Sequence, residues 1–152
     1  MKFELNLDKG EWFPFFKSEM LEDGEVKYID PEPDEPCRVK FRLADADFIE
    51  KMQAETRKEV VERVLNPKTR QMERIKDYDQ TPTQRKAERE MVWGNAIMEW
   101  EGVLDVNEDE VSCTLENKML MMNIPIFSRY AIRCLQLISG EASEEKEALR
   151  GN

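Results

Sequence analysis

The sequence contains no histidine. Histidine is the usual general acid or base near neutral pH and a frequent metal ligand, so its absence excludes Ser-His-Asp and Cys-His catalysis and every histidine metal site. The three cysteines, Cys37, Cys113 and Cys134, are too few for a four-thiolate zinc site. Their odd number and wide spacing are typical of reduced thiols in a cytoplasm rather than of a disulfide framework. We therefore expect no metal and no cofactor.

Glycine and long apolar runs are also scarce. The six glycines are not clustered, so there is no glycine-rich loop to cradle a phosphate. No stretch approaches the roughly 18 to 20 apolar residues of a membrane span, and the amino-terminal residues lack the apolar run of a secretory signal. With 33 acidic and 23 basic residues, the formal net charge of -10 disfavours nucleic acid as the main partner. These features predict a cytoplasmic protein that binds neither a membrane nor nucleic acid.

The 152 residues predict one α+β domain over residues 1–140, followed by a charged tail at 141–152 that is frayed or disordered. Pro14 cannot donate a ladder hydrogen bond, so its strand is expected at a sheet edge or at a bulge. The expected fold is an N-terminal antiparallel sheet of three to four strands packed against a C-terminal helical part. Alternating apolar and polar residues, bounded by turn signals, predict the strands 3–7, 11–16, 25–29 and 37–43.

Capping residues and apolar spacing predict the helices. The expected ranges are about 45–65 after Asp45, about 68–77, from Thr81 or Thr83 to Leu104, 115–123 after Thr114, and 124–139 between Asn123 and Gly140. Residues 91–105, MVWGNAIMEWEGVLD, hold two of the three tryptophans and fall in the third of these helices. Spacings of three and four residues place its large apolar residues on one face, which favours a core over a ligand site. The predicted core residues are Trp93, Ile97, Trp100, Phe127 and Cys134.

Two apolar segments are candidates for binding another protein. Residues 11–16, EWFPFF, are apolar on both faces of a strand, and residues 119–123, MLMMN, hold three methionines, whose flexible side chains suit adaptable surfaces. Burial in the chain's own core is the alternative for each segment. The candidate partner-binding residues are Trp12, Phe13, Phe15, Met119, Met121 and Met122. Self-association into a homo-oligomer is a further expectation.

The order of several short motifs resembles a known family. W-E-G-V-L-D (100–105) is followed by a polar turn, T-L-E-N (114–117), an apolar helix, and N-I-P-I-F (123–127) at the start of a last helix. G-E-W-F-P-F-F (10–16) and C-R-V-K-F-R-L (37–43) precede them in the same order as in that family. The chain thereby resembles the small tail assembly chaperones of tailed bacteriophages and prophages. It departs from them in the proline-rich acidic segment 30–36 and in residues 66–90.

The resemblance implies a non-catalytic function in the bacterial host cytoplasm. Such chaperones bind the long, helical tape-measure protein during tail morphogenesis and keep it soluble until tube protein polymerises around it. The family prescribes no catalytic residues. The alternatives are a structural tail or neck component of the phage, or an enzyme of unknown substrate. With 33 acidic residues, any pairing of carboxylates in the sequence is uninformative about catalysis.

Overall fold

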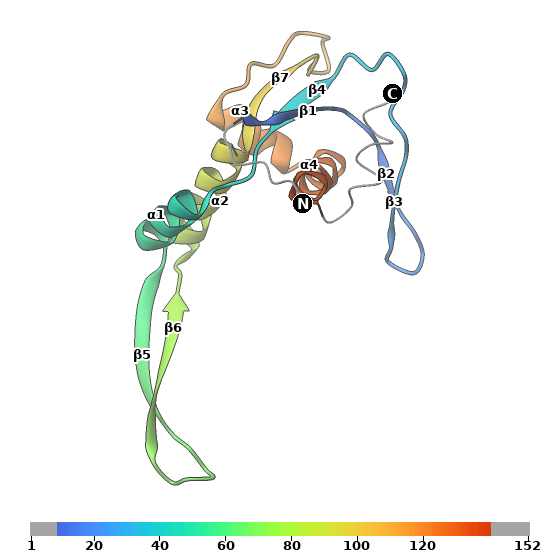
Figure 1. Ribbon diagram of the computed structural model, residues 1–152. Helices are drawn as coiled ribbons and strands as arrows, with labels where there is room; N and C mark the ends of the chain where they lie inside the picture. Colours follow the sequence, from blue (N-terminus) through green and yellow to red (C-terminus); the bar gives the residue numbers. More distant parts are fainter. Residues whose placement is uncertain (1–8, 141–152) are drawn as a thin grey trace, which may run out of the picture. The chain divides into compact units, whose positions relative to one another are not determined.

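The computed structural model describes residues 9–140, with the backbone alone for residues 58–64 and 73–79 (Figure 1). The predicted strand 3–7 and the predicted tail 141–152 lie outside the described residues. The chain divides into two compact units. The described part of the first unit comprises residues 9–44 and 92–140, and the second unit comprises residues 45–91. The α+β class is confirmed, with an antiparallel sheet and a C-terminal helical part in the first unit.

The first unit is built on a three-stranded antiparallel sheet with the order β1-β4-β7. Its strands are β1 (Glu11–Pro14), β4 (Arg38–Phe41) and β7 (Ile97–Glu101). The strand with Pro14 lies at the edge of this sheet, as its missing N–H predicts. A small separate hairpin follows β1 and is formed by β2 (Ser18–Met20) and β3 (Val26–Tyr28). The predicted strands at 11–16, 25–29 and 37–43 are therefore confirmed in their centres.

The strand β7 corrects the prediction of a helix through Leu104. The helix α2 (Pro82–Ala96) ends earlier, and the next five residues pair with β4. Val39 and Phe41 of β4, two residues apart, pair with Trp100 and Ile97, which are three residues apart, because the register shifts between Lys40 and Phe41. A bulge that adds one residue to β7 thus brings both large side chains to the buried face. The spacing of three that indicated a helix is the spacing of a bulged strand.

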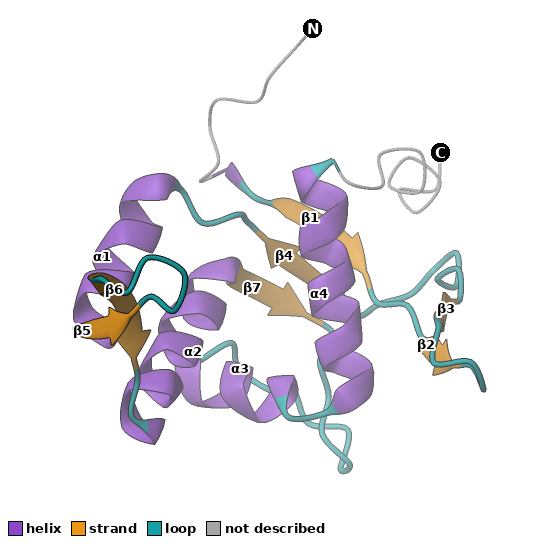
Figure 2. Cartoon of the chain, turned by 90° about the horizontal axis from the view of Figure 1, so that it is seen from below, coloured by secondary structure: helices purple, strands orange, loops and turns teal. Residues whose placement is uncertain are grey.

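The two C-terminal helices are α3 (Leu115–Met122) and α4 (Pro125–Ser139). They pack against each other, and α4 covers one face of the sheet, where Figure 2 shows it lying across the three strands. The caps at Thr114 and Gly140 are confirmed, whereas α4 begins after Ile124 rather than after Asn123, which closes α3. Pro125 can take the first helical position because the N–H that it lacks has no partner within the helix there. The core between α4 and the sheet includes Phe13, Val39, Phe41, Ile97, Trp100, Phe127, Tyr130, Ala131, Cys134 and Leu137.

The second unit consists of α1 (Ala46–Thr56), β5 (Lys58–Leu65), β6 (Met72–Asp79) and the first part of α2. Asp45 caps α1 by accepting from the backbone N–H of Phe48 at 2.7 Å, which confirms that cap. Thr81 caps α2, with its hydroxyl accepting from the Gln84 N–H at 3.1 Å and the Gln84 side chain accepting from the Thr81 N–H at 2.9 Å. The predicted helix is wrong beyond residue 56.

The residues beyond α1 form a long antiparallel hairpin instead of the predicted helices to 65 and over 68–77 (Figure 1). Their apolar residues fit a helical period, but three of them, Val60, Val61 and Val64, are β-branched and favour extended backbone. Asn66 and Pro67 then begin the loop that reverses the chain. The whole second unit lies in the connection between β4 and β7, which are neighbours in the sheet of the first unit.

The turn after β7 requires a glycine at position 102. Gly102 has a φ of +72°, and a Cβ added there would clash with the backbone carbonyl of Pro36. The indole N–H of Trp100 donates to the Val111 carbonyl oxygen at 2.6 Å, so the two sides of the turn are joined. Within the turn, the Asp105 carboxylate accepts from the backbone N–H groups of Asn107 and Asp109 at 2.8 and 3.1 Å. The acidic segment 105–110 is a self-capped turn.

We expect Gly102→Ala to lower the free energy of unfolding by about 2–5 kcal/mol, because left-handed strain and overpacking act together. Gly24→Ala is the matched control, since Gly24 has a φ of +87° but nothing within 4 Å of an added Cβ. It should cost about 1–2 kcal/mol, the strain alone. Urea unfolding followed by tryptophan fluorescence measures this, because all three tryptophans belong to the first unit. Equal losses for the two variants would contradict the close approach at Pro36.

Candidate functional site

The predicted aromatic partner surface at β1 is smaller than the sequence indicated. Phe13 is completely buried in the core, so it is removed from that surface. Phe15 is half-buried and its ring makes an edge contact with the ring of Tyr130, with centroids 5.1 Å apart. Trp12 is also half-buried, and the guanidinium of Arg38 lies over its ring at 5.1 Å from the centroid. The strand's two apolar faces are thus mostly occupied within the first unit.

The predicted methionine surface on α3 is likewise corrected. Met122 is buried in the core and cannot meet a partner in this fold. Met119 and Met121 are half-buried, and Met121 packs against the core. The exposed apolar side chains of this region are neighbours that the sequence analysis did not select. They are Leu115 and Leu120 on α3 and Ile124 at the start of α4, with 48%, 57% and 45% of their surface exposed, and we use the name α3 surface for these three residues.

Residue type directs attention to the methionines of this segment and not to the leucines and the isoleucine beside them. The signal available in the sequence for a shared apolar surface was the spacing of four residues between Leu120 and Ile124. Leu115 lies close to Gly94, since a Cβ added at that glycine would be 3.1 Å from the leucine Cδ1. The side chain of Lys118 donates to the Gly94 carbonyl oxygen at 3.1 Å. These contacts hold α3 against the last turn of α2.

The predicted core residues, unlike most of the partner-binding candidates, lie where they were expected. Ile97, Trp100, Phe127 and Cys134 lie in the core, and Trp93 is half-buried against it. The residues that carry the family resemblance also have structural contacts. Trp100 and Gly102 shape the turn described above, and the Asn117 side chain donates to the Ser112 carbonyl oxygen at 2.9 Å next to the Thr114 cap. The motifs therefore mark folding constraints rather than a catalytic constellation.

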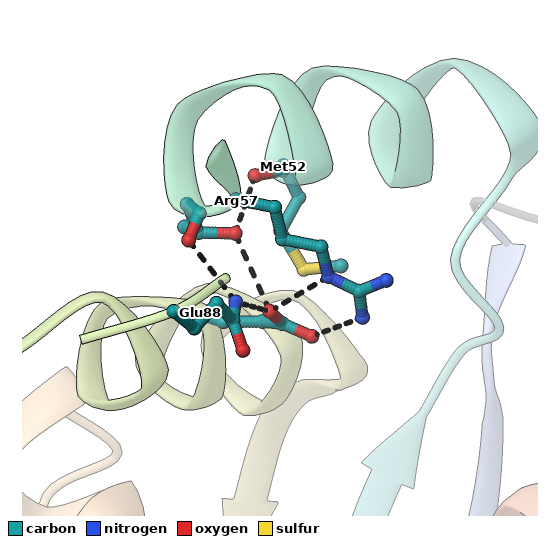
Figure 3. A network of polar contacts seen from close by, with 5 residues as sticks. Met52, Arg57 and Glu88 are labelled. Carbon is teal, nitrogen blue, oxygen red and sulfur yellow. Dashed lines mark hydrogen bonds and ion pairs between the residues drawn. The ribbon is translucent and has the colours of Figure 1, made fainter. Parts of the chain in front are cut away.

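A polar network in the second unit joins the base of the β5–β6 hairpin to α2 (Figure 3). Arg57 grips the Glu88 carboxylate with two donors, at 2.8 Å from Nη2 to Oε1 and 3.2 Å from Nε to Oε2. Gln80 donates to the same carboxylate and, at 3.0 Å, to the Thr56 carbonyl oxygen. The Thr56 hydroxyl donates to the Met52 carbonyl oxygen at 2.7 Å. Residues from the end of α1, the end of β6 and the middle of α2 are thereby fastened together.

The charge state of Glu88 argues against proton transfer by this network. The hydrogen bonds from Arg57 lower the pKa of Glu88, and those from Gln80 and Thr56 add to that effect, against a smaller opposing effect of burial. A general acid or base is most effective when its pKa lies near the working pH. Glu88 is instead held ionised by a bidentate arginine, and the arrangement suits fastening rather than catalysis.

The three thiols and the buried phenol of Tyr130 are not activated. Burial raises the pKa of Cys134 and of Tyr130 well above their ordinary values, raises the pKa of Cys37 to about 11, and also raises the pKa of Cys113. The thiolate is the nucleophilic form of cysteine, so none of these thiols is prepared for attack near neutral pH. Among the side chains that the structure describes, those of residues 9–57, 65–72 and 80–140, no three acidic or cysteine side chains gather where they could hold a metal ion. Within residues 9–140, no helix combines the length and apolarity needed to cross a membrane.

Comparisons of the chain with protein-family models, with curated proteins and with solved structures found no significant match. A functional hypothesis therefore depends on the geometry of the described residues and on the order of the sequence motifs.

We expect Glu88→Gln to lower the free energy of unfolding by about 1–2 kcal/mol at pH 7, because Arg57 loses its charged acceptor. The pKa of Glu88 is lower in the folded chain, so its stabilising contribution is complete above its unfolded pKa. That contribution disappears as the pH falls through the folded pKa, and the stabilities of the native chain and the variant should therefore converge in acid. Glu55→Gln, at an exposed position of α1, is the control. It should change neither the free energy of unfolding at pH 7 nor its dependence on pH.

Thermal unfolding followed by circular dichroism at several pH values checks this expectation. Hydrogen exchange in peptides from residues 45–91 locates the loss. A constant difference between the native chain and Glu88→Gln down to strong acid would show that the charge of Glu88 is not what stabilises the hairpin base.

Proposed function

We propose that the chain is a non-catalytic assembly factor of a phage or prophage tail. In this proposal it is a chaperone that binds the tape-measure protein in the bacterial host cytoplasm during tail morphogenesis. The α3 surface carries the proposal. Leu115, Leu120 and Ile124 are large, exposed apolar side chains, and they belong to residues 93–139, the part of the chain that most resembles the tail assembly chaperones.

The chemistry of the α3 surface suits a helical client. An amphipathic helix presents apolar side chains every three or four residues and binds a partner through an apolar surface with polar surroundings. Exposed apolar side chains on a folded domain are typical of protein-interaction sites. A chaperone must also keep its client soluble, and the net charge of -10 adds electrostatic repulsion between complexes. These properties support binding of a long helical protein.

The ionisable groups of the described residues support a binding function over an enzyme. The thiols have raised pKa values, and the lowered pKa of Glu88 results from an ion pair that fastens a hairpin. Neither provides the perturbed acid, base or nucleophile that a catalytic site uses. A protein–protein function requires none of these groups.

We expect the native chain, co-expressed with the longest coiled-coil protein encoded beside it, to keep that protein soluble and to co-purify with it. The double variant Leu120→Asp, Ile124→Asp should reduce the retained client about tenfold or more, because two charges replace apolar contacts. Val106→Asp is the matched control, since Val106 is 98% exposed and lies in the acidic turn outside the α3 surface. It should retain the client at the native level.

A client that is equally soluble alone, with nothing co-eluting, would refute the chaperone proposal. Equal loss of client by the double variant and by the Val106 control would refute the α3 surface as the binding site. Purified virions distinguish the alternative of a structural tail or neck component, because an assembly chaperone should be missing from them and a structural component should be present.

A further inference from the structure

The outer edge of β5 has no partner strand among residues 9–140. β5 and β6 form a two-stranded sheet of eight residue pairs, from Lys58 opposite Asp79 to Leu65 opposite Met72. An isolated hairpin is marginally stable in water, and three or more strands are usually needed for stability. An unpaired edge also offers a row of N–H and C=O groups to another strand. A third strand paired with β5 would add the strand that the hairpin lacks and would bond to these backbone groups.

The loop at the end of the hairpin determines which residues of β5 present these groups outward. The Asn66 N–H donates to the Gln71 carbonyl oxygen at 2.8 Å, so positions 66 and 71 are a hydrogen-bonded pair. Hydrogen-bonded and non-hydrogen-bonded pairs alternate along an antiparallel ladder. Positions 64, 62, 60 and 58 therefore bond to β6. Positions 59, 61 and 63 direct their backbone groups to the outer edge.

We propose that β5 pairs antiparallel with β5 of a second copy of this chain, with the two-fold axis at Val61, to form a four-stranded sheet. In that register Val61 lies opposite the partner's Val61. Glu59 lies opposite the partner's Arg63, and the two-fold axis repeats this pairing on the other side. The outward-facing positions 59, 61 and 63 are the ones that bond directly across the axis.

Charge complementarity selects a second copy as the occupant. Within the hairpin, Arg63 lies directly opposite Arg74, and like charges in opposing positions destabilise a sheet. The partner's Glu59 brings a negative charge to the other side of Arg63 and offsets that repulsion. The β-branched residues at and beside the axis also favour strand pairing.

The outer edge of β6 does not share this complementarity. Every two-fold pairing of β6 with itself, centred anywhere from Glu73 to Asp77, places like charges opposite each other. Centring at Ile75, for example, opposes Arg74 with the partner's Lys76. The edge of β5 is thus the one that accepts a copy of itself. The Arg57–Glu88 network restrains the base of the hairpin, which reduces the entropy lost when β5 pairs.

Charge exchange at the two paired positions tests the proposal in the full-length chain. Sedimentation velocity over a range of concentrations should show the native chain as a dimer in equilibrium with monomer. Arg63→Glu opposes two glutamates on each side of the axis and should raise the dimer Kd about tenfold or more. The same variant places a glutamate opposite Arg74 within the hairpin, so loss of the dimer cannot be attributed to a weakened hairpin.

Glu59→Arg should weaken the dimer in the same way, because it opposes two arginines. A mixture of the Glu59→Arg and Arg63→Glu chains should form a heterodimer, and the double variant with both exchanges should recover the native Kd. Glu62→Arg is the control with the same change of net charge as Glu59→Arg. Position 62 lies opposite Val60 of the second copy in the proposed register, so its Kd should stay native.

A native chain that is monomeric at every concentration would overturn the proposal. A dimer that resists both single variants, or that responds to Glu62→Arg as strongly as to Glu59→Arg, would overturn it as well. The test is independent of the α3 surface and of the tail-assembly proposal, since it requires no client.

Discussion

Tyr130 joins α4 to the strands of the first unit and to the residues after β1 through a hydrogen bond and aromatic contacts. Its hydroxyl donates to the Phe13 carbonyl oxygen at 2.6 Å, which ties α4 to the edge strand β1. Its ring is completely buried and makes aromatic contacts with Phe15, Phe16, Phe41 and Phe127, at centroid distances of 4.9 to 5.7 Å. A buried phenol needs a hydrogen-bond partner, and the edge strand supplies a carbonyl oxygen. The position of α4 over the sheet, and with it the position of α3, depends on this arrangement.

The two surfaces that we propose for binding consist of groups that take no part in the core of the first unit. They are the exposed side chains of the α3 surface and the backbone edge of β5. α4 covers the buried face of the sheet, and Leu120 on α3 and Ile124 just before α4 remain outside the core. The second unit contributes no strand to that sheet, although it is inserted between two of its neighbouring strands. The β5 edge of its hairpin has no partner strand among residues 9–140. One surface is apolar and the other is a backbone edge, so they fit chemically different partners.

The elements that were predicted correctly are those governed by local chemistry. Asp45, Thr81, Thr114 and Gly140 cap helices because their side chains, or in the glycine its positive φ, satisfy local geometry. The strand predicted at 37–43 was also correct, because apolar and basic residues alternate along it without interruption. The failures at β5, β6 and β7 share a cause. Apolar residues spaced by three and four fit a helix, but a bulged or β-branched strand can carry the same spacing.

The candidate surfaces were less predictable than the fold. The type of residue directed attention to Phe13 and Met122, which the core occupies, and away from Leu120 and Ile124, which it leaves exposed. Side-chain type measures the free energy of burial, but only the packed arrangement determines which of several equivalent apolar residues is buried. The network around Glu88 was also hidden, because the residues that it joins are far apart in the chain. Arg57 is 31 positions from Glu88, and Thr56 is 24 positions from Gln80.

The sequence by itself determined the chemistry that is excluded, the net charge, the caps and the α+β class, because composition and local geometry suffice for these. The tertiary structure decided that Ile97 and Trp100 lie on a bulged strand, since the extra residue is defined only by its pairing with β4. It also decided which apolar residues of α3 remain exposed and which backbone edge has no partner strand within residues 9–140. Burial and strand pairing are properties of segments far apart in the chain, and no local pattern specifies them.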